Sequence, residues 1–305
     1  VSVADVEKCL KAVDPFKAAG SDSVPGIVLR QCANVLAPPL SCIINSSLQS
    51  GVVPTTFKHS HISPLHTAGD RSSARNYRPV SLLPIVSRIL EQFVKRQLTE
   101  YLYSNDLYPM TQFAYRPRHS TEDALVLAVN RWLLAKSERK YTGLVMIDMS
   151  KAFDRVQHER LVNELYTLGI GGAPLHWFCD YLSGRSQQVR VLDSLSCSVG
   201  CTRGVPQGSV LGPILFVLYT RNLHTALPAT VNHQEFADDI ILDFSHPDLD
   251  FVGRTLTRAV TDISRWLEDI GLVMNASKTQ VMFVQPRGAA IATPDVFCNN
   301  EQLEV

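Results

Sequence analysis

The chain has 305 residues, of which 45% are hydrophobic and 19% are charged, with 29 basic and 29 acidic side chains. This composition supports a sizeable folded core and excludes an intrinsically disordered chain. The sequence has no run of 18 apolar residues, which excludes a transmembrane helix, and its net charge of zero argues against a uniformly basic nucleic-acid binder.

Charge is distributed unevenly along the chain. Residues 71–118 contain 8 basic and 3 acidic side chains, whereas residues 235–269 contain 9 acidic and 3 basic ones. A basic region attracts phosphates and an acidic region collects metal cations, although even solvation explains many of these charges equally well. The 7 cysteines form no paired metal motif, which favours reduced thiols in an intracellular protein.

The N-terminal part is predicted to be mainly helical. Apolar residues at helical spacing predict helices over 3–13, 27–36 and 40–48, with Ser2 capping the first of them. The pair Pro38-Pro39 is expected to break the helical pattern between the last two segments. The first Met and a secretory signal are both missing, so we expect a fragment of a longer protein.

A proline-stiffened stretch and an amphipathic helix follow a predicted strand over 58–65. Arg78 precedes Pro79, so its guanidinium is held on a stiff backbone, which suits a phosphate clamp. Residues 85–103 predict an amphipathic helix with a basic outer face. That face is either solvated or in contact with nucleic acid, and the pattern alone leaves both open.

A turn rich in arginine and aromatic residues occupies Gln112–Thr121. Arg116 lies within it, and aromatic rings alternating with arginine suit base stacking and phosphate contact. Ser120 or Thr121 is expected to cap the next helix, which runs to about Lys136.

Asp148 follows a short apolar run, Leu144–Ile147, which predicts a buried strand ending in an acid. After two predicted helices and a predicted hairpin, a loop rich in glycine and proline spans Arg203–Pro213. Its glycines allow the backbone to approach a ligand closely, and Gln207 can hydrogen-bond to a base or to backbone. A turn of this composition before a helix is common, so by itself it is a weak signal.

Two adjacent acids, Asp238 and Asp239, lie between apolar runs, and this pattern predicts a tight β-hairpin tip. Neighbouring carboxylates repel one another unless a cation neutralises them, and hard divalent ions such as Mg²⁺ or Mn²⁺ suit carboxylate oxygens. An isolated Asp-Asp pair is usually a solvated turn. Together with Asp148, however, three carboxylates suit two cations about 3.5–4 Å apart, the arrangement used for phosphoryl transfer.

Six stretches, taken in this order, resemble the reverse transcriptases of non-LTR (LINE-like) retrotransposons. They are Asn76–Pro79, Gln112–Thr121, Asp148–Asp154, Arg203–Pro213, Phe236–Asp239 and Asn275–Thr279. The resemblance covers about residues 20–300. It implies an α+β, right-hand polymerase fold with fingers and palm, in which helices flank a ferredoxin-like antiparallel sheet and the thumb is largely absent.

The resemblance also implies a division of the chain. The expected segments are an N-terminal extension (1–60), fingers (61–142 and 160–206), palm (143–159 and 207–296) and the start of a missing primer grip and thumb (297–305).

Site residues are carried over from the same motifs. Asp148, Asp238 and Asp239 match the family's metal ligands for two Mg²⁺ or Mn²⁺ ions. Lys278 is expected to meet the leaving pyrophosphate, with a plain surface lysine as the alternative. The expected nucleotide-binding residues are Arg78, Arg116, Met149, Phe153, Gln207 and Gly208, and Phe153 is expected to block a ribose 2′-hydroxyl. The expected template and primer contacts are Gly204, Pro206, Phe236 and Ala237.

The sequence departs from the family pattern in a few places. Arg221-Asn222-Leu223 stands where the family often has Asn-Asp-Leu, and Phe236 stands where tyrosine is frequent. The chain stops at Val305, where the family continues into the primer grip and thumb, and the endonuclease that often precedes the domain is absent.

The predicted function is RNA-directed DNA polymerase, serving retrotransposition. The expected partners are an RNA template, a DNA primer, deoxynucleoside triphosphates and fused endonuclease and thumb regions, with no membrane. The nucleus and cytoplasm are the expected locations. One alternative is a metal-dependent phosphodiesterase, against which Phe153 and the Arg203–Pro213 loop argue. The other is an inactive or domesticated nucleic-acid-binding remnant, against which the presence of all three acids argues.

Overall fold

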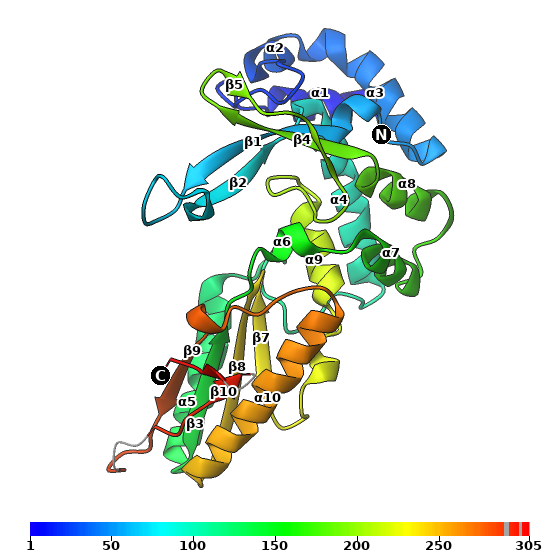
Figure 1. The fold of residues 1–305 in the computed structure, drawn as a ribbon. Helices are drawn as coiled ribbons and strands as arrows, with labels where there is room; N and C mark the ends of the chain where they lie inside the picture. Colours follow the sequence, from blue (N-terminus) through cyan, green and yellow to red (C-terminus); the bar gives the residue numbers. More distant parts are fainter. Residues whose placement is uncertain (290–292, 299–300, 305) are drawn as a thin grey trace. The chain divides into compact units, whose positions relative to one another are not determined.

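The computed structural model describes residues 1–289, 293–298 and 301–304. The chain forms two compact units, each built from two separate stretches of sequence (Figure 1). The first unit contains Val1–Leu107 and Gln157–Leu215, and the second contains Tyr108–Val156 and Phe216–Val305. Both units combine helices with strands, so the described chain has mixed α/β content.

The units divide the chain at positions that differ from the expected segments. Residues 108–142, expected in the fingers, lie in the second unit. The names fingers and palm therefore remain predictions for these segments. The expected primer-grip segment, 297–305, includes residues 299, 300 and 305, which lie outside the described residues.

In the first unit, helices accompany a mixed sheet. Its helices are α1 (Val3–Lys11), α2 (Gly26–Gln31), α3 (Ala33–Ser50), α4 (Ile85–Ser104), α7 (His158–Thr167) and α8 (Gly172–Leu182). Its strands are β1 (His59–His66), β2 (Tyr77–Leu82), β4 (Arg185–Val191), β5 (Ser194–Leu195) and β6 (Val199–Cys201). Strand β1 pairs antiparallel with β2 and parallel with β4, and β4 pairs antiparallel with β5 and β6. Helix α9 (Gly212–Thr220) carries the chain from the first unit into the second.

The helix starts follow the predicted capping chemistry, but one predicted helix break is wrong. Ser2 forms a capping box with Asp5 at the start of α1, as its hydroxyl accepts the Asp5 N–H. The break expected at Pro38 and Pro39 falls instead at Cys32, and α3 runs through both prolines. The two missing N–H groups weaken the early part of the helix, but the proline rings fix a helical φ, and packing of its buried face outweighs the loss.

In the second unit, helices cover a four-stranded antiparallel sheet. The strands are β3 (Tyr141–Ile147), β7 (Asn232–Phe236), β8 (Asp239–His246) and β9 (Gln280–Val284), in the order β7-β8-β3-β9. The helices are α5 (Thr121–Ser137), α6 (Ala152–Arg155) and α10 (Leu249–Asp269). Strand β10 (Phe297–Cys298) pairs antiparallel with β11 (Glu301–Gln302). Within the described chain, no helix is both long enough and apolar enough to cross a bilayer.

Helices α10 and α5 pack on opposite faces of this sheet, as Figure 1 shows for the second unit. On one face, Gly143 of β3 leaves room for α10, because an added Cβ would lie 2.4 Å from the Leu256 side chain. On the other face, the buried carboxylate of Asp243 in β8 forms an ion pair with Arg131 of α5. With a helix on each face, most residues of β3 and β8 are buried or half-buried, whereas Asp239 at the start of β8 is exposed.

Candidate active site

The predicted hairpin tip is confirmed. The last pair between β7 and β8 is Phe236 with Asp239, which leaves Ala237 and Asp238 as a two-residue turn. Ala237 has a φ of +59°, a conformation in which glycine is the usual residue at the first position of such a turn. An alanine there carries about 1–2 kcal/mol of steric strain, so its surroundings must hold the turn in place.

Asp148 lies at the same end of the sheet as the Asp-Asp pair. Strand β3 pairs with β8 up to Ile147 opposite Ile240, so Asp148 and Asp239 are the next residues on neighbouring strands. The Asp148 carboxylate accepts a hydrogen bond from the Asn275 side-chain amide at 3.1 Å. The Asn275 N–H also donates to the Asp148 backbone oxygen at 2.8 Å, so Asn275 holds both parts of this residue.

The three acids act on one another electrostatically. Partial burial raises the pKa of Asp239, and the negative charges of Asp238 and Asp148 raise it further. The Asp239 side chain remains open to solvent. A cation beside these carboxylates would relieve their repulsion, so the donor set fits a hard divalent ion.

The acids do not by themselves enclose a cation. Within the part of the chain that the structure describes, no three His, Cys, Asp or Glu side chains form a group that could hold a metal ion. The role of Asp148, Asp238 and Asp239 as ligands of two cations therefore stays a prediction. Such openness is compatible with Mg²⁺, which usually binds one or two carboxylates and takes its other ligands from water and substrate phosphates.

Gln112 forms hydrogen bonds to the Ala237–Asp238 turn, a role that was not predicted from the sequence. Its side chain is fully buried, and its Oε1 accepts the N–H groups of Ala237 at 2.9 Å and Ala114 at 3.0 Å. Its Nε2 donates to the Ala237 oxygen at 3.3 Å. A glutamine in a loop looks like any polar residue in the sequence, so only the fold reveals this contact.

A second buried polar residue, Glu235, precedes the turn. It accepts a hydrogen bond from the Thr111 hydroxyl at 3.1 Å, and burial raises its pKa to about 7. His233 Nε2 lies 3.9 Å from the Glu235 carboxylate, and burial lowers the pKa of this histidine. Since burial drives both groups toward their neutral forms, the pair is closer to two neutral side chains than to an ion pair at neutral pH.

We expect Glu235 to make folding stability fall as the pH rises. The folded protein keeps the Glu235 proton up to about pH 7, whereas the unfolded chain loses it near the ordinary value of 4.5. The contribution of Glu235 is therefore favourable below that value and is lost between it and about pH 7, by about 3 kcal/mol. Urea unfolding of wild type and Glu235→Gln at about pH 5 and about pH 8 measures this change. Equal pH dependence of the two proteins would show that Glu235 does not titrate in this way.

The remaining predicted residues of the second unit lie after β3, beside the turn or after α10. Met149 is buried and forms a β-bridge with Met274, while the half-buried ring of Phe153 stacks on Phe216 at a centroid distance of 4.6 Å. Arg116 is turned onto its own loop, where it donates to the Met110 oxygen at 3.4 Å. The side chain of Lys278 is exposed. The roles of these residues stay predictions.

The other predicted residues belong to the first unit, in which β2 and α7 hold the loop Arg203–Pro213. The Ser81 N–H donates to the Gln207 oxygen at 2.7 Å, and His158 Nε2 donates to the Gly204 oxygen at 2.8 Å. Gly208 has a φ of +107°, and a Cβ there would lie 2.9 Å from the Ser81 oxygen. Glycine at 208 is therefore required by the close approach of β2. Arg78 is exposed on the same strand.

A buried carboxylate, that of Glu91, binds the backbone of the Arg203–Pro213 loop. Glu91 of α4 accepts the N–H groups of Val210 at 2.7 Å and Leu211 at 3.0 Å, just before α9 begins. Burial raises the pKa of Glu91, and these N–H groups and the nearby Arg185 offset part of that increase. This role could not be predicted from the sequence, because Glu91 occupies an ordinary position in an amphipathic helix.

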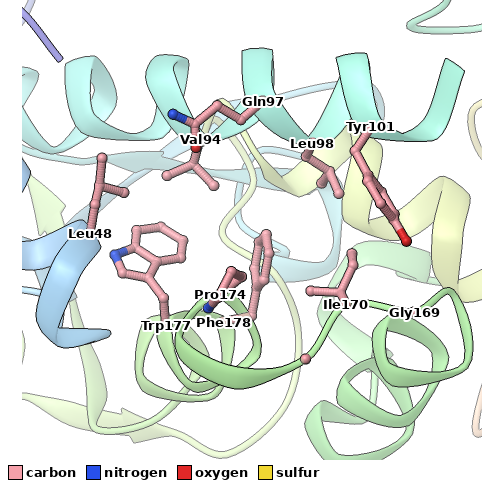
Figure 2. A pocket seen from close by; sticks show the side chains of 11 residues that line it. Leu48, Val94, Gln97, Leu98, Tyr101, Gly169, Ile170, Pro174, Trp177 and Phe178 are labelled. Carbon is pink, nitrogen blue, oxygen red and sulfur yellow. The ribbon is translucent and has the colours of Figure 1, made fainter. Parts of the chain in front are cut away.

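An apolar hollow of the first unit lies away from these residues. It has a volume of about 340 Å³ and lies between α4, α8 and the end of α3, with Val94, Tyr101, Trp177 and Phe178 among its walls (Figure 2). None of the predicted site residues lines it.

A comparison with protein families identifies the chain. A family model described as "Reverse transcriptase (RNA-dependent DNA polymerase)" matches residues 66–302. The chain belongs to the reverse transcriptase family. The match contains the hairpin acids, Asp148, the Arg203–Pro213 loop and Gln112, so the geometry above belongs to a reverse transcriptase domain.

Relatives of this reverse transcriptase domain come from transposable elements. One is named "Probable RNA-directed DNA polymerase from transposon BS" of Drosophila melanogaster and is 31% identical, over 92% of this chain and 32% of the relative. Another, "RNA-directed DNA polymerase from mobile element jockey" of the same species, is 27% identical over 95% of this chain and 32% of the relative. The chain thus spans about a third of the length of these relatives.

Proposed function

We propose that this reverse transcriptase domain adds deoxynucleotides to a primer 3′-hydroxyl on an RNA template, in the service of retrotransposition. The observation that carries the proposal is the placement of Asp148 and the Asp238-Asp239 pair at one end of neighbouring strands, within a matched reverse transcriptase segment. Names of the relatives agree with this activity.

In the proposed mechanism, two Mg²⁺ or Mn²⁺ ions, when bound, lower the pKa of the primer hydroxyl and neutralise charge on the departing pyrophosphate. Asp148 and Asp238 would hold both ions, and Asp239 would support them. Asn275 fixes the Asp148 carboxylate through its 3.1 Å hydrogen bond. The exposed Lys278 would meet the pyrophosphate. Positioning and charge neutralisation would then supply most of the acceleration.

Further residues are proposed to hold the nucleotide and the nucleic acids. Arg78, Arg116, Met149, Gln207 and Gly208 are proposed to contact the incoming nucleotide. Gly204, Pro206, Phe236 and Ala237 are proposed to contact template and primer. Basic side chains would bind the phosphate backbone without reading the sequence.

The finer features of the resemblance are also part of the proposal. They comprise a right-hand architecture with fingers, a ferredoxin-like palm sheet and little of a thumb, at the segment boundaries predicted from the sequence. The proposal also includes a DNA primer, fused endonuclease and thumb regions, and action in the nucleus and cytoplasm.

Primer extension tests the activity. The protein, an RNA template with an annealed DNA primer, deoxynucleotides and Mg²⁺ should yield extended primer, and EDTA should abolish the product. Degradation of the primer without extension would favour the phosphodiesterase alternative. The nucleic-acid-binding remnant would be favoured if the protein binds the primer–template without extending the primer. This result should hold with Mn²⁺ as well as Mg²⁺, and also in a longer chain that adds the following region.

We expect Phe153→Ala to weaken discrimination against ribonucleotides. Phe216 holds the Phe153 ring by stacking, at an interplanar angle of 26°, so the ring is a fixed wall. Removing it should lower the preference for deoxynucleotides over ribonucleotides by about 10²-fold, the usual scale for rejecting one added hydroxyl in an apolar pocket. The ratio of kcat/KM values for the two nucleotides measures this, with Phe153→Tyr as the control that keeps the bulk. An unchanged ratio in Phe153→Ala would remove Phe153 from this role.

A further inference from the structure

We propose that Gln112 is a positioning residue of the candidate active site, which fixes the Ala237–Asp238 turn and thereby the placement of the two acids. The inference rests on the proposed function, because it takes Asp238 and Asp239 to be the cation-binding residues. Gln112 itself would touch neither metal nor substrate, and it would act through the backbone of Ala237.

The first support is that Gln112 satisfies both backbone groups of Ala237. The β7–β8 ladder ends at Phe236 and Asp239, so Ala237 lies beyond the last strand pair. Gln112 accepts the Ala237 N–H at 2.9 Å and donates to its oxygen at 3.3 Å. A primary amide is the side-chain group that offers an acceptor and a donor side by side, so glutamine fits this double contact.

The second support is the strain at Ala237. With a φ of +59°, this alanine occupies a region that favours glycine, and a non-glycine residue persists there only when its neighbours hold it. The two hydrogen bonds between the Gln112 side chain and the Ala237 backbone, here called the Gln112 clamp, hold this alanine in place. Without the clamp, the turn is free to relax to a conformation in which Asp238 projects in another direction.

The third support is that the segment carrying Gln112 is itself fixed to the hairpin. The Glu235 N–H donates to the Thr111 oxygen and the Phe113 N–H donates to the Glu235 oxygen, both at 2.9 Å. These bonds form a parallel bridge between Gln112 and Glu235. Since the same segment is hydrogen-bonded to β7 on either side of Gln112, the glutamine amide is a rigid support and not a mobile loop contact.

Nearby side chains place this segment close to the acids. Tyr115, three residues after Gln112, has its pKa raised by burial and by the charge of Asp238. Tyr115 also has a φ of +58°, so the backbone turns sharply directly after the clamp. The hairpin tip and the segment Thr111–Tyr115 are thus neighbours over several residues, and a change at Gln112 acts on the acids over a short distance.

The test compares Gln112→Ala with Gln234→Ala, a matched control. Gln234 is also a buried glutamine, and it lies on the same hairpin, but its side-chain amide has no hydrogen-bond partner among the described residues. The first measurement is hydrogen exchange of the peptide covering 232–242 in metal-free protein. Gln112→Ala should speed exchange at Ala237 by about tenfold or more, and Gln234→Ala should not.

The second measurement is Mn²⁺ affinity by electron paramagnetic resonance, with Asp238→Asn as the reference that removes a ligand. Gln112→Ala should weaken Mn²⁺ binding by about tenfold or more, the scale seen when support of metal ligands is lost. Ala237→Gly added to Gln112→Ala should restore part of the affinity, because glycine tolerates the positive φ without a clamp.

Three outcomes decide the inference. Unchanged exchange in Gln112→Ala would overturn it, since the turn would then not depend on the clamp. Faster exchange with unchanged Mn²⁺ affinity would also overturn it, because Gln112 would then be a purely structural residue. If Asp238→Asn does not weaken Mn²⁺ binding, the proposed function fails instead, and the exchange result still shows whether Gln112 holds the turn.

Discussion

Replacing Asp238 by asparagine is expected to slow primer extension by about 10³-fold, which corresponds to about 4 kcal/mol of barrier. Asparagine keeps the shape of the side chain and is well tolerated in turns, so the hairpin should persist. The substitution removes one negative charge from a set in which Asp238 and Asp148 already raise the pKa of Asp239. The cation that neutralises the set would therefore be held less tightly.

The measurement is steady-state extension by wild type and variant at several Mg²⁺ concentrations. Asp250→Asn is a suitable control, because this exposed aspartate lies in the first turn of α10, where loss of its charge affects only the helix end. Retention of a rate within tenfold of wild type by Asp238→Asn would exclude this residue from the proposed site.

The second large effect is expected in the first unit, on folding stability. Glu91→Ala should lower the free energy of unfolding by about 3 kcal/mol, since it leaves the N–H groups of Val210 and Leu211 without an acceptor and opens a cavity. Glu91→Gln should cost less than about 1 kcal/mol, because it keeps an acceptor oxygen and because burial already favours the neutral form of Glu91.

Urea unfolding followed by Trp177 fluorescence measures this effect. Trp177 belongs to the first unit and stacks on Tyr181, so in a background with Trp132→Phe and Trp266→Phe it reports on that unit alone. Gln92→Ala, an exposed neighbour on α4, is the control for the helix itself. Equal stability of Glu91→Ala and Glu91→Gln would show that the carboxylate does not hold the start of α9.

Local chemistry was sufficient to predict the hairpin tip. An apolar run before Asp148, and apolar runs on either side of Asp238 and Asp239, predicted strands that end in carboxylates. In the structure these carboxylates lie at the ends of the neighbouring strands β3 and β8. Capping chemistry at Ser120 predicted the start of α5, where its hydroxyl accepts the Asp123 N–H. Such features depend on residues within a few positions of one another, which is why a single sequence reveals them.

Contacts between distant residues could not be predicted in this way. The parallel pairing of β1 with β4 joins His59 to Ser186, and nothing in the local period of either strand specifies its partner. Gln112 and Glu91 were missed for the same reason, since their partners lie more than a hundred residues further along the chain. The continuation of α3 through Pro38 shows the reverse case, in which packing overrides a strong local preference.

The position of β3 in its sheet has a consequence for synthesis on the ribosome. Its neighbours β8 and β9 both follow it in sequence, and β9 ends about 140 residues after β3. At a translation rate of about 5–20 residues per second, β3 waits about 7–28 s before its second neighbour has been made. Until β8 is complete, about 100 residues after β3, the apolar strand Tyr141–Ile147 has two open edges, and one edge stays open until β9 has been made. Strands of other molecules can pair with such open edges. Chaperones that cover exposed strands on nascent chains should therefore increase the yield of correctly folded protein.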